Sequence, residues 1–171
     1  MNGPVDELAE ALKDIHSVFI VTPGPSEDRG KIALNAAKAC KKANVPFTVL
    51  VSVTVADKKD TTFGKQFGPL EEGFWELGIE GCIMRLPLFM DNLMGFFGTI
   101  GEKGQFYAPV TPTNTYSPVA LIDVADAYAA LIHNPKKHSK RKYSLFSDSI
   151  SHLQLQEEFR TAMGSQNVTF V

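Results

Sequence analysis

Polar side chains that follow short apolar runs are the residues of this chain best placed to do chemistry. Ser52 ends an apolar run at residues 47–51, and Thr22 and Pro23 follow another at residues 18–21. In α/β proteins, ligands bind at the carboxyl ends of such strands. The Ser52 hydroxyl could donate a hydrogen bond to a substrate carbonyl, or it could satisfy the backbone at the strand end. Thr22 and Pro23 could contact a cofactor, or they could form a plain turn.

Histidine, cysteine and acidic residues show no pattern typical of a metal site. The four histidines are widely spaced, and the acids of residues 91–126 are spread over a loop and a helix, so we expect no metal. The two cysteines, Cys40 and Cys82, lie in apolar stretches and form no Cys-x-x-Cys motif. This usage is typical of reduced, structural thiols in a cytosolic protein.

The elements that position these residues alternate between strands and helices. Continuous apolar runs predict buried strands at residues 18–21 and 47–51. Further strands are expected at residues 82–86 and 142–146, with short strands at 105–108 and 168–171. Helical periodicity predicts helices at residues 5–12, 32–43, 70–77, 119–133 and 151–164, the last opened by a capping box. The order favours an α/β fold, with a parallel sheet of about four strands flanked by helices on both faces.

Composition sets the broad class of the protein. The 171 residues are 44% hydrophobic and 21% charged, with a net charge of −2, so neither nucleic acid nor a membrane is an expected partner. The first residues lack the pattern of a signal peptide, which predicts a cytoplasmic protein. A basic run at residues 136–142 could be a nuclear-import or phosphate patch, or an exposed loop between a helix and a strand.

Four segments, in order, resemble the NmrA-like branch of the atypical short-chain dehydrogenases. The resemblance extends over nearly the whole chain and depends on the order and spacing of these segments. They are residues 8–12 with 18–23, residues 35–39 with 51–53, residues 71–72 with 78–79 and 85–93, and residues 123–125 with 134–138.

The resemblance implies a partial Rossmann-type sheet with a small C-terminal substrate lobe, as one domain over residues 1–171. The sheet remainder would occupy residues 1–86, and residues 87–171 would be mostly lobe. Family members bind NADP(H) or NAD(H); some reduce small carbonyls or quinones, and others sense the cofactor ratio. By this resemblance Ser52 lies near the nicotinamide, as do Pro87, Phe89 and Asn92. Phe89 could equally belong to the core.

The chain departs from the family pattern in its acid–base residues. It has no Tyr-x-x-x-Lys pair, and Phe67 stands where NmrA-like members carry a lysine, four residues before Glu71. Lys65 is two residues away and long enough to serve, or it could be a solvated loop charge. Ser52 and Lys65 are therefore the candidate catalytic residues, and both are also candidate cofactor contacts.

The glycine turn that grips the pyrophosphate in this family is a second departure. Only seventeen residues precede Val18, too few for the strands and helices that come before the matching strand. Residues 95–101 spell GxxGxxG, but no clear strand precedes them, and we interpret them as a flexible apolar connection. We therefore expect a truncated protein in which the strand at residues 18–22 is an edge open to self-association.

Three functions follow from these observations. The first is a weak NADP(H) binder with a regulatory or redox-sensing role. The second is an NAD(P)H-dependent oxidoreductase acting on a small carbonyl or quinone, with the missing part supplied. The third is a non-enzymatic protein-interaction module that pairs through its open strand or its basic loop.

Overall fold

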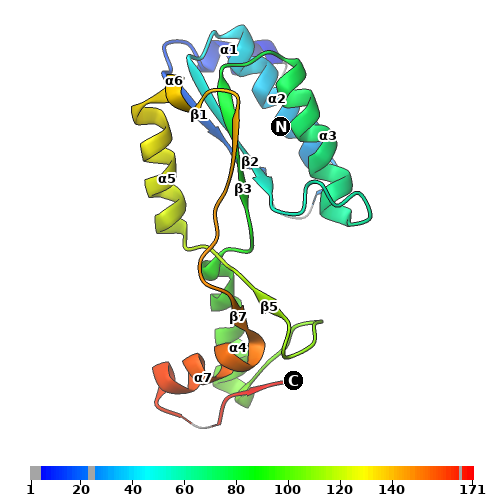
Figure 1. Cartoon of the computed structure of the whole chain (residues 1–171), viewed down its shortest axis with the longest axis vertical. Coiled ribbons are helices and arrows are strands. Elements are labelled where there is room, and N and C mark those ends of the chain that lie inside the picture. Colours follow the sequence, from blue (N-terminus) through cyan, green and yellow to red (C-terminus); the bar gives the residue numbers. More distant parts are fainter. Residues whose placement is uncertain (1–4, 23–25, 166) are drawn as a thin grey trace. The chain divides into compact units, whose positions relative to one another are not determined.

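The computed structural model describes residues 5–22, 26–165 and 167–171, which form two compact units (Figure 1). The first, here called the sheet unit, comprises residues up to 86 together with 124–145. The second unit comprises residues 87–123 and 146–171. No helix of the described residues is long and apolar enough to cross a lipid bilayer.

The sheet unit is built on four parallel strands in the order β1-β2-β3-β6. The strands are β1 (Ser17–Ile20), β2 (Phe47–Val53), β3 (Gly81–Leu86) and β6 (Arg141–Ser144). Every residue of β3 is buried, as is all of β2 except its last residue, which explains their continuous apolar runs. The predicted α/β fold with a parallel four-stranded sheet is confirmed.

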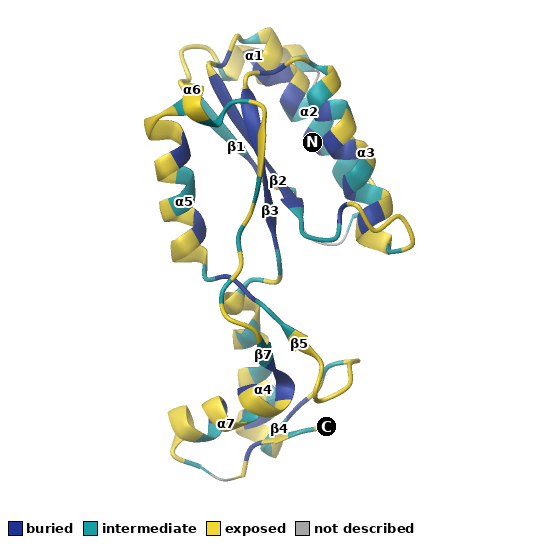
Figure 2. Cartoon of the chain, viewed as in Figure 1, coloured by how far each residue is buried: buried dark blue, intermediate teal, exposed yellow. Residues whose placement is uncertain are grey.

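Helices cover both faces of this sheet. On one face α2 (Arg29–Lys42) and α3 (Thr62–Glu76) share a core with alternate strand residues such as Ile20, Leu50 and Ile83. On the other face α5 (Leu121–His133) packs on β1, where the Tyr128 ring lies 4.6 Å from the Phe19 ring, between centroids. The first helix, α1 (Val5–Ala11), packs against α2, and the short α6 (Pro135–His138) precedes β6. Figure 2 shows that α2 and α3 bury one side each, as amphipathic helices do.

The start of α3 differs from the expectation. The sequence predicts this helix at residues 70–77, yet it begins at Thr62. Thr61 caps it, accepting a 2.9 Å hydrogen bond from the Gly64 backbone N–H. Gly64, Gly68 and Pro69 in its first half weaken the helical pattern in the sequence, and packing of the buried face overrides that weakness.

The second unit has its own aromatic core around Phe106, which is fully buried. Its elements are η1 (Met90–Phe96), α4 (Phe97–Lys103), β4 (Gln105–Phe106), β5 (Thr115–Tyr116), β7 (Ile150–Ser151), α7 (His152–Met163) and β8 (Thr169–Phe170). Strand β4 pairs in parallel with β8, and β5 pairs antiparallel with β7. The flexible connection predicted at residues 95–101 is wrong, because these residues lie in η1 and α4 and the αL residue Gly104 closes the helix.

Two local predictions are confirmed by the structure. Ser151 and Gln154 form a reciprocal capping box at the start of α7, and Gly164 ends the helix in the left-handed conformation. Cys40 and Cys82 are both free and fully buried. Burial raises the pKa of the Cys82 thiol to about 12, so this residue stays protonated and unreactive near neutral pH.

Candidate functional site

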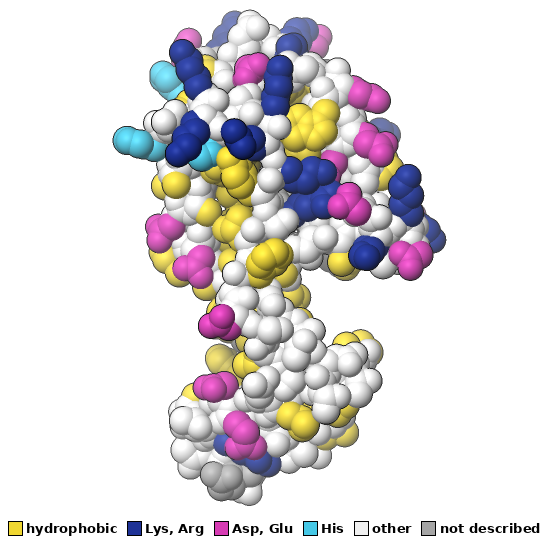
Figure 3. Space-filling view, viewed as in Figure 1, with side chains coloured by type: hydrophobic (Ala, Val, Ile, Leu, Met, Phe, Trp, Pro, Cys, Tyr) yellow, Lys and Arg dark blue, Asp and Glu magenta, His cyan; other side chains and the backbone are white. Residues whose placement is uncertain are grey.

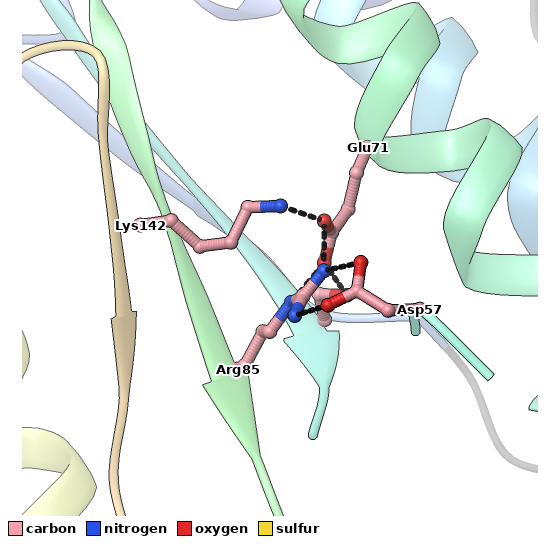
Figure 4. Close-up of polar contacts among 5 residues, drawn as sticks. Asp57, Glu71, Arg85 and Lys142 are labelled. Atoms are coloured by element: carbon pink, nitrogen blue, oxygen red, sulfur yellow. Dashed lines mark hydrogen bonds and ion pairs between the residues drawn. The ribbon is translucent and has the colours of Figure 1, made fainter. Parts of the chain in front are cut away.

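Five polar side chains meet at the carboxyl ends of β2 and β3, and we call them the Glu71 cluster: Ser52, Asp57, Glu71, Arg85 and Lys142 (Figure 4). The Ser52 hydroxyl donates to Glu71 Oε1 at 2.5 Å. The Arg85 guanidinium donates hydrogen bonds to both carboxylate oxygens of Glu71 at 2.7 Å. It also donates hydrogen bonds to both carboxylate oxygens of Asp57. The Lys142 ammonium lies 2.6 Å from Glu71 Oε2. All five side chains belong to the sheet unit.

The backbone explains why these groups meet. Ser52 and Arg85 are register partners on neighbouring strands, so their side chains leave the same face of the sheet. Glu71 lies on the buried face of α3 with Phe67, Leu70 and Phe74, at the spacing that places residues on one side of a helix. A carboxylate on that face points at the sheet and requires a cation opposite it.

The electrostatics of the cluster favour fully charged groups. Burial by itself raises the pKa of Glu71, but hydrogen bonds from Arg85, Lys142 and Ser52 outweigh it, so the pKa lies below its usual value. The hydrogen bond from Arg85 likewise lowers the pKa of the exposed Asp57 carboxyl. Both carboxylates raise the pKa of Arg85. Near neutral pH the cluster therefore holds two anions and two cations in mutual contact.

A pocket of about 490 Å³ opens beside the cluster. Its lining includes Lys65, Glu71 and Lys142, with the Trp75 ring on one wall. Lys65 lies on the first turn of α3, and its side chain is exposed. The face of the sheet unit in Figure 3 carries lysine and arginine side chains interspersed with carboxylates, so the surface there has no single sign of charge. Of the two candidate catalytic residues, Lys65 lines this pocket, whereas Ser52 is buried behind it and bonded to Glu71.

The remaining candidate residues lie elsewhere. Thr22 follows β1 in the sheet unit and is half-buried, and Pro23 lies outside the described residues. Pro87, Phe89 and Asn92 belong to the second unit. Phe89 forms a bridge with Val119, whereas Asn92 is exposed at the rim of a second pocket.

The described residues do not fit the pyrophosphate of a dinucleotide. Such a group binds where a glycine-rich turn leads from a strand into the free N–H groups of a helix. Before α2 the described part of the turn carries Glu27 and Asp28, whose charges repel phosphate. At α3 the Thr61 side chain already occupies a first-turn N–H.

Of the five residues in the Glu71 cluster, the sequence analysis identified Ser52 as a candidate and missed the other four. Arg85, Asp57 and Lys142 were not singled out for chemistry, and Glu71 served only as a family landmark. The signal was present, since Arg85 interrupts the apolar run of a buried strand and Glu71 interrupts the apolar face of a helix. Two opposite charges at buried positions of adjacent elements predict an ion pair.

The sequence is similar to that of a curated protein. An NAD(P)H azoreductase from Xenophilus azovorans is 29% identical to this chain over 140 residues, which are 80% of the chain and 47% of that protein. The chain thus spans about half the length of this relative. No family model matches the chain.

Solved structures with similar folds are numerous. An NADPH-dependent quinone oxidoreductase from Escherichia coli, crystallised with NADPH, matches the whole chain with a TM-score of 0.87 and 22% identity, over 60% of its own length. A nucleoside-diphosphate-sugar epimerase from Staphylococcus aureus matches 98% of the chain with a TM-score of 0.84 and 20% identity, over 60% of its length. NmrA, a negative transcriptional regulator, matches 99% of the chain with a TM-score of 0.78 and 18% identity, over 57% of its length. The resemblance found in the sequence is confirmed, and the chain has the fold of the NmrA-like atypical short-chain dehydrogenases.

Proposed function

We propose that this chain is the nicotinamide-side part of an NAD(P)H-dependent reductase of the NmrA-like type and that alone it binds NADP(H) weakly. The observation that carries the proposal is the 140-residue match to an NAD(P)H azoreductase. The parallel strand ends support it, because they place Thr22 and Ser52 along the edge where α/β folds bind ligands. A chain that binds NADP(H) without catalysing hydride transfer would suit a regulatory or redox-sensing role.

The state of the Glu71 cluster favours binding over catalysis. The Ser52 proton is directed to Glu71, which already accepts from Arg85 and Lys142. A hydroxyl held this way is not free to protonate a substrate. A bound dinucleotide would supply the hydride of a reduction. Among the candidate catalytic residues, Lys65 alone is exposed beside the pocket and able to donate a hydrogen bond there.

Titration calorimetry with NADPH tests this proposal. We expect a Kd on the order of 0.1 mM, because the described residues offer the pyrophosphate no glycine turn. At about 1 mM ligand this affinity would stabilise the fold by about 1.4 kcal/mol, which a thermal melt detects. Lys65→Ala should weaken binding, whereas Lys38→Ala, an exposed lysine on α2, should not. Parallel titrations with NADH give the cofactor preference.

Two results would count against this function. If NADPH does not bind to the folded chain, the dinucleotide role fails for this polypeptide. If Lys65→Ala and Lys38→Ala bind NADPH as the unmodified chain does, the pocket beside the Glu71 cluster is not the binding site. Submicromolar binding of NADPH would contradict the proposal that this chain alone binds the dinucleotide weakly.

The free edge of β1 supports a second candidate, a protein-interaction module. Strand β1 ends the sheet, and in the described part of the chain no strand pairs with its outer side. Unpaired backbone groups on a sheet edge accept another strand. Ile20 is unsuitable for a test, since it is only 5% exposed and belongs to the core. Val21 directly follows the strand and is 54% exposed.

A lysine at that position should reveal any such pairing. If the chain self-associates through β1, Val21→Lys should shift sedimentation toward the monomer, because a charge at a sheet edge disfavours strand addition. Ile132→Lys, at an exposed position of α5, is the matched control. Unchanged association in Val21→Lys, or a monomer at every concentration without any substitution, would remove the β1 edge as an interface.

A further inference from the structure

Strand β6 forms the second edge of the sheet, at the end opposite β1. It pairs with β3, and within the described residues no strand pairs with its other side. The Lys140 backbone N–H donates a 2.7 Å hydrogen bond to the Gly81 carbonyl. Because successive residues of a strand direct their N–H and C=O groups to opposite sides, those of Arg141 and Tyr143 point away from β3. The strand is largely exposed, so an added strand can reach these groups.

The basic run of residues 136–142 leads into this edge and carries positive charge without matching carboxylates. Lys142 is paired with Glu71, but within the described residues no carboxylate forms an ion pair with the other four cations of the run. All four are exposed: Lys136, Lys137, Lys140 and Arg141. Glu80 accepts a hydrogen bond from Ser139 and offsets only part of this charge. The face as a whole carries both signs of charge, so the excess is local to this end of β6.

The run is folded into the sheet unit and is not a loose basic tail. His138 Nδ1 lies 2.7 Å from the Tyr143 hydroxyl oxygen, and this contact joins α6 to β6. Arg141 Nε donates a 3.1 Å hydrogen bond to the Lys137 carbonyl. Residues 141–144 pair with β3, so in the folded chain they cannot lie as a free extended peptide in the groove of another protein, as a nuclear-import signal does. A partner must therefore bind to the folded edge.

The free backbone groups and the cations together favour an acidic strand as the partner. Unpaired N–H and C=O groups at a sheet edge accept a further strand. Lysine and arginine at an edge repel a basic strand, including a second copy of β6. They attract a strand that carries carboxylates, because complementary charge selects the partner of an interface. Nucleic acid would also be attracted by the cations, but it does not form the ladder of backbone hydrogen bonds that a strand forms.

We infer that the outer edge of β6 binds an extended acidic segment of a partner protein by strand addition. The backbone of the partner bonds Arg141 and Tyr143, and its carboxylates lie against the four exposed cations of the run. Because these cations lie at or before the first residue of β6, the acidic residues belong at one end of the partner strand. The inference goes beyond the dinucleotide role, does not depend on it, and concerns a different edge from β1.

Fluorescent peptides test the inference on the full chain, without any dinucleotide. Each probe joins four glutamates to Thr-Val-Thr-Val, in either order, because an added strand can run in either direction. We expect a Kd on the order of 0.1 mM for the better order, since exposed ion pairs contribute little individually. Raising the salt to about 1 M should weaken binding about tenfold, as should four glutamines in place of the glutamates. In NMR spectra the amides of Arg141 and Tyr143 should shift on binding.

Methylation of the peptide backbone separates strand addition from attraction between charges alone. Alternate residues of an added strand direct their N–H groups toward β6. Methylating every second N–H of the Thr-Val part should weaken binding about tenfold in one phase and leave it unchanged in the other. Oligothymidylate with four phosphates carries comparable charge without a peptide backbone, and we expect it to bind more weakly than the acidic peptide.

Charge reversals locate the binding on the protein. Lys137→Glu combined with Arg141→Glu should abolish binding of the acidic probe, because carboxylates then face its glutamates. Lys31→Glu combined with Lys38→Glu is the matched control, since it makes the same change in net charge at two exposed positions of α2. The control should bind the probe as the unmodified chain does. Amide spectra of both double variants confirm that they are folded.

Several outcomes would overturn the inference. One is that the acidic probe does not bind the folded chain, and another is that it binds the two double variants equally. A third is that both methylated probes bind as the parent peptide does. A fourth is that oligothymidylate binds as tightly as the peptide, because the cations then form a general anion site. Failure of NADPH to bind would leave this inference standing, and failure of the acidic probe would leave the dinucleotide proposal standing.

Discussion

Replacing Arg85 by methionine should lower the free energy of unfolding of the sheet unit by about 3–5 kcal/mol. Methionine fills much of the same volume, but Glu71 then keeps a buried charge with only Lys142 and the Ser52 hydroxyl beside it. Arg85 is 7% exposed and Glu71 is 3% exposed, so water cannot replace the lost guanidinium. Trp75, the chain's single tryptophan, lies on α3 next to this region, so its fluorescence during urea unfolding measures the effect.

Two further variants show whether the loss comes from the unpaired carboxylate. Asp57→Asn removes an exposed partner of Arg85 and should shift the Trp75 transition far less. Arg85→Met combined with Glu71→Leu removes both buried charges and should recover much of the lost stability. If the double variant is no more stable than Arg85→Met, the loss is due to packing, and the buried charge is not its cause.

The dependence of stability on pH gives an independent measure of the same cluster. The folded pKa of Glu71 lies below its ordinary value of 4.5. The unfolded chain therefore binds this proton more readily, and the stabilisation from Glu71 is complete above about pH 5 and is lost as pH falls through the folded pKa. In Glu71→Gln the part of the acid-induced destabilisation that belongs to this carboxyl should disappear.

The sequence was enough to predict the sheet because its strands have a simple pattern. Strands β2 and β3 are buried on both faces, so each appears as a mainly apolar run, and the short β1 is apolar after its first residue. Strand β6, at the other edge, is polar and largely exposed and does not follow this rule. The second unit was harder to predict. Its strands β5 and β7 have two residues each, and pairing across the 33 residues between Tyr116 and Ile150 stabilises them more than local preference does.

The candidate site was predicted only in part, for a related reason. Ser52 and Lys65 were found because strand ends and long amines are recognisable along the chain. The Glu71 cluster arises from register, since Ser52 lies opposite Arg85 only once β2 and β3 are aligned.

Phe106→Ala should destabilise the second unit by about 3–5 kcal/mol, the usual cost of removing a fully buried phenylalanine. The Phe106 ring lies 5.2 Å, between centroids, from each of the Phe96, Phe159 and Phe170 rings, so its removal leaves a cavity at the centre of this core. Hydrogen exchange followed by mass spectrometry measures the loss, as faster exchange in peptides from α7 and β4. Phe97→Ala is the matched control, because that ring is 53% exposed and touches only the border of the core.

The same variant shows whether the two cores unfold independently. Each unit has its own buried cluster, so Phe106→Ala should leave the urea midpoint of Trp75 fluorescence in place while it speeds exchange in the second unit. Arg85→Met should give the opposite pattern. If Phe106→Ala moves the Trp75 midpoint as far as Arg85→Met does, the chain unfolds as one cooperative unit.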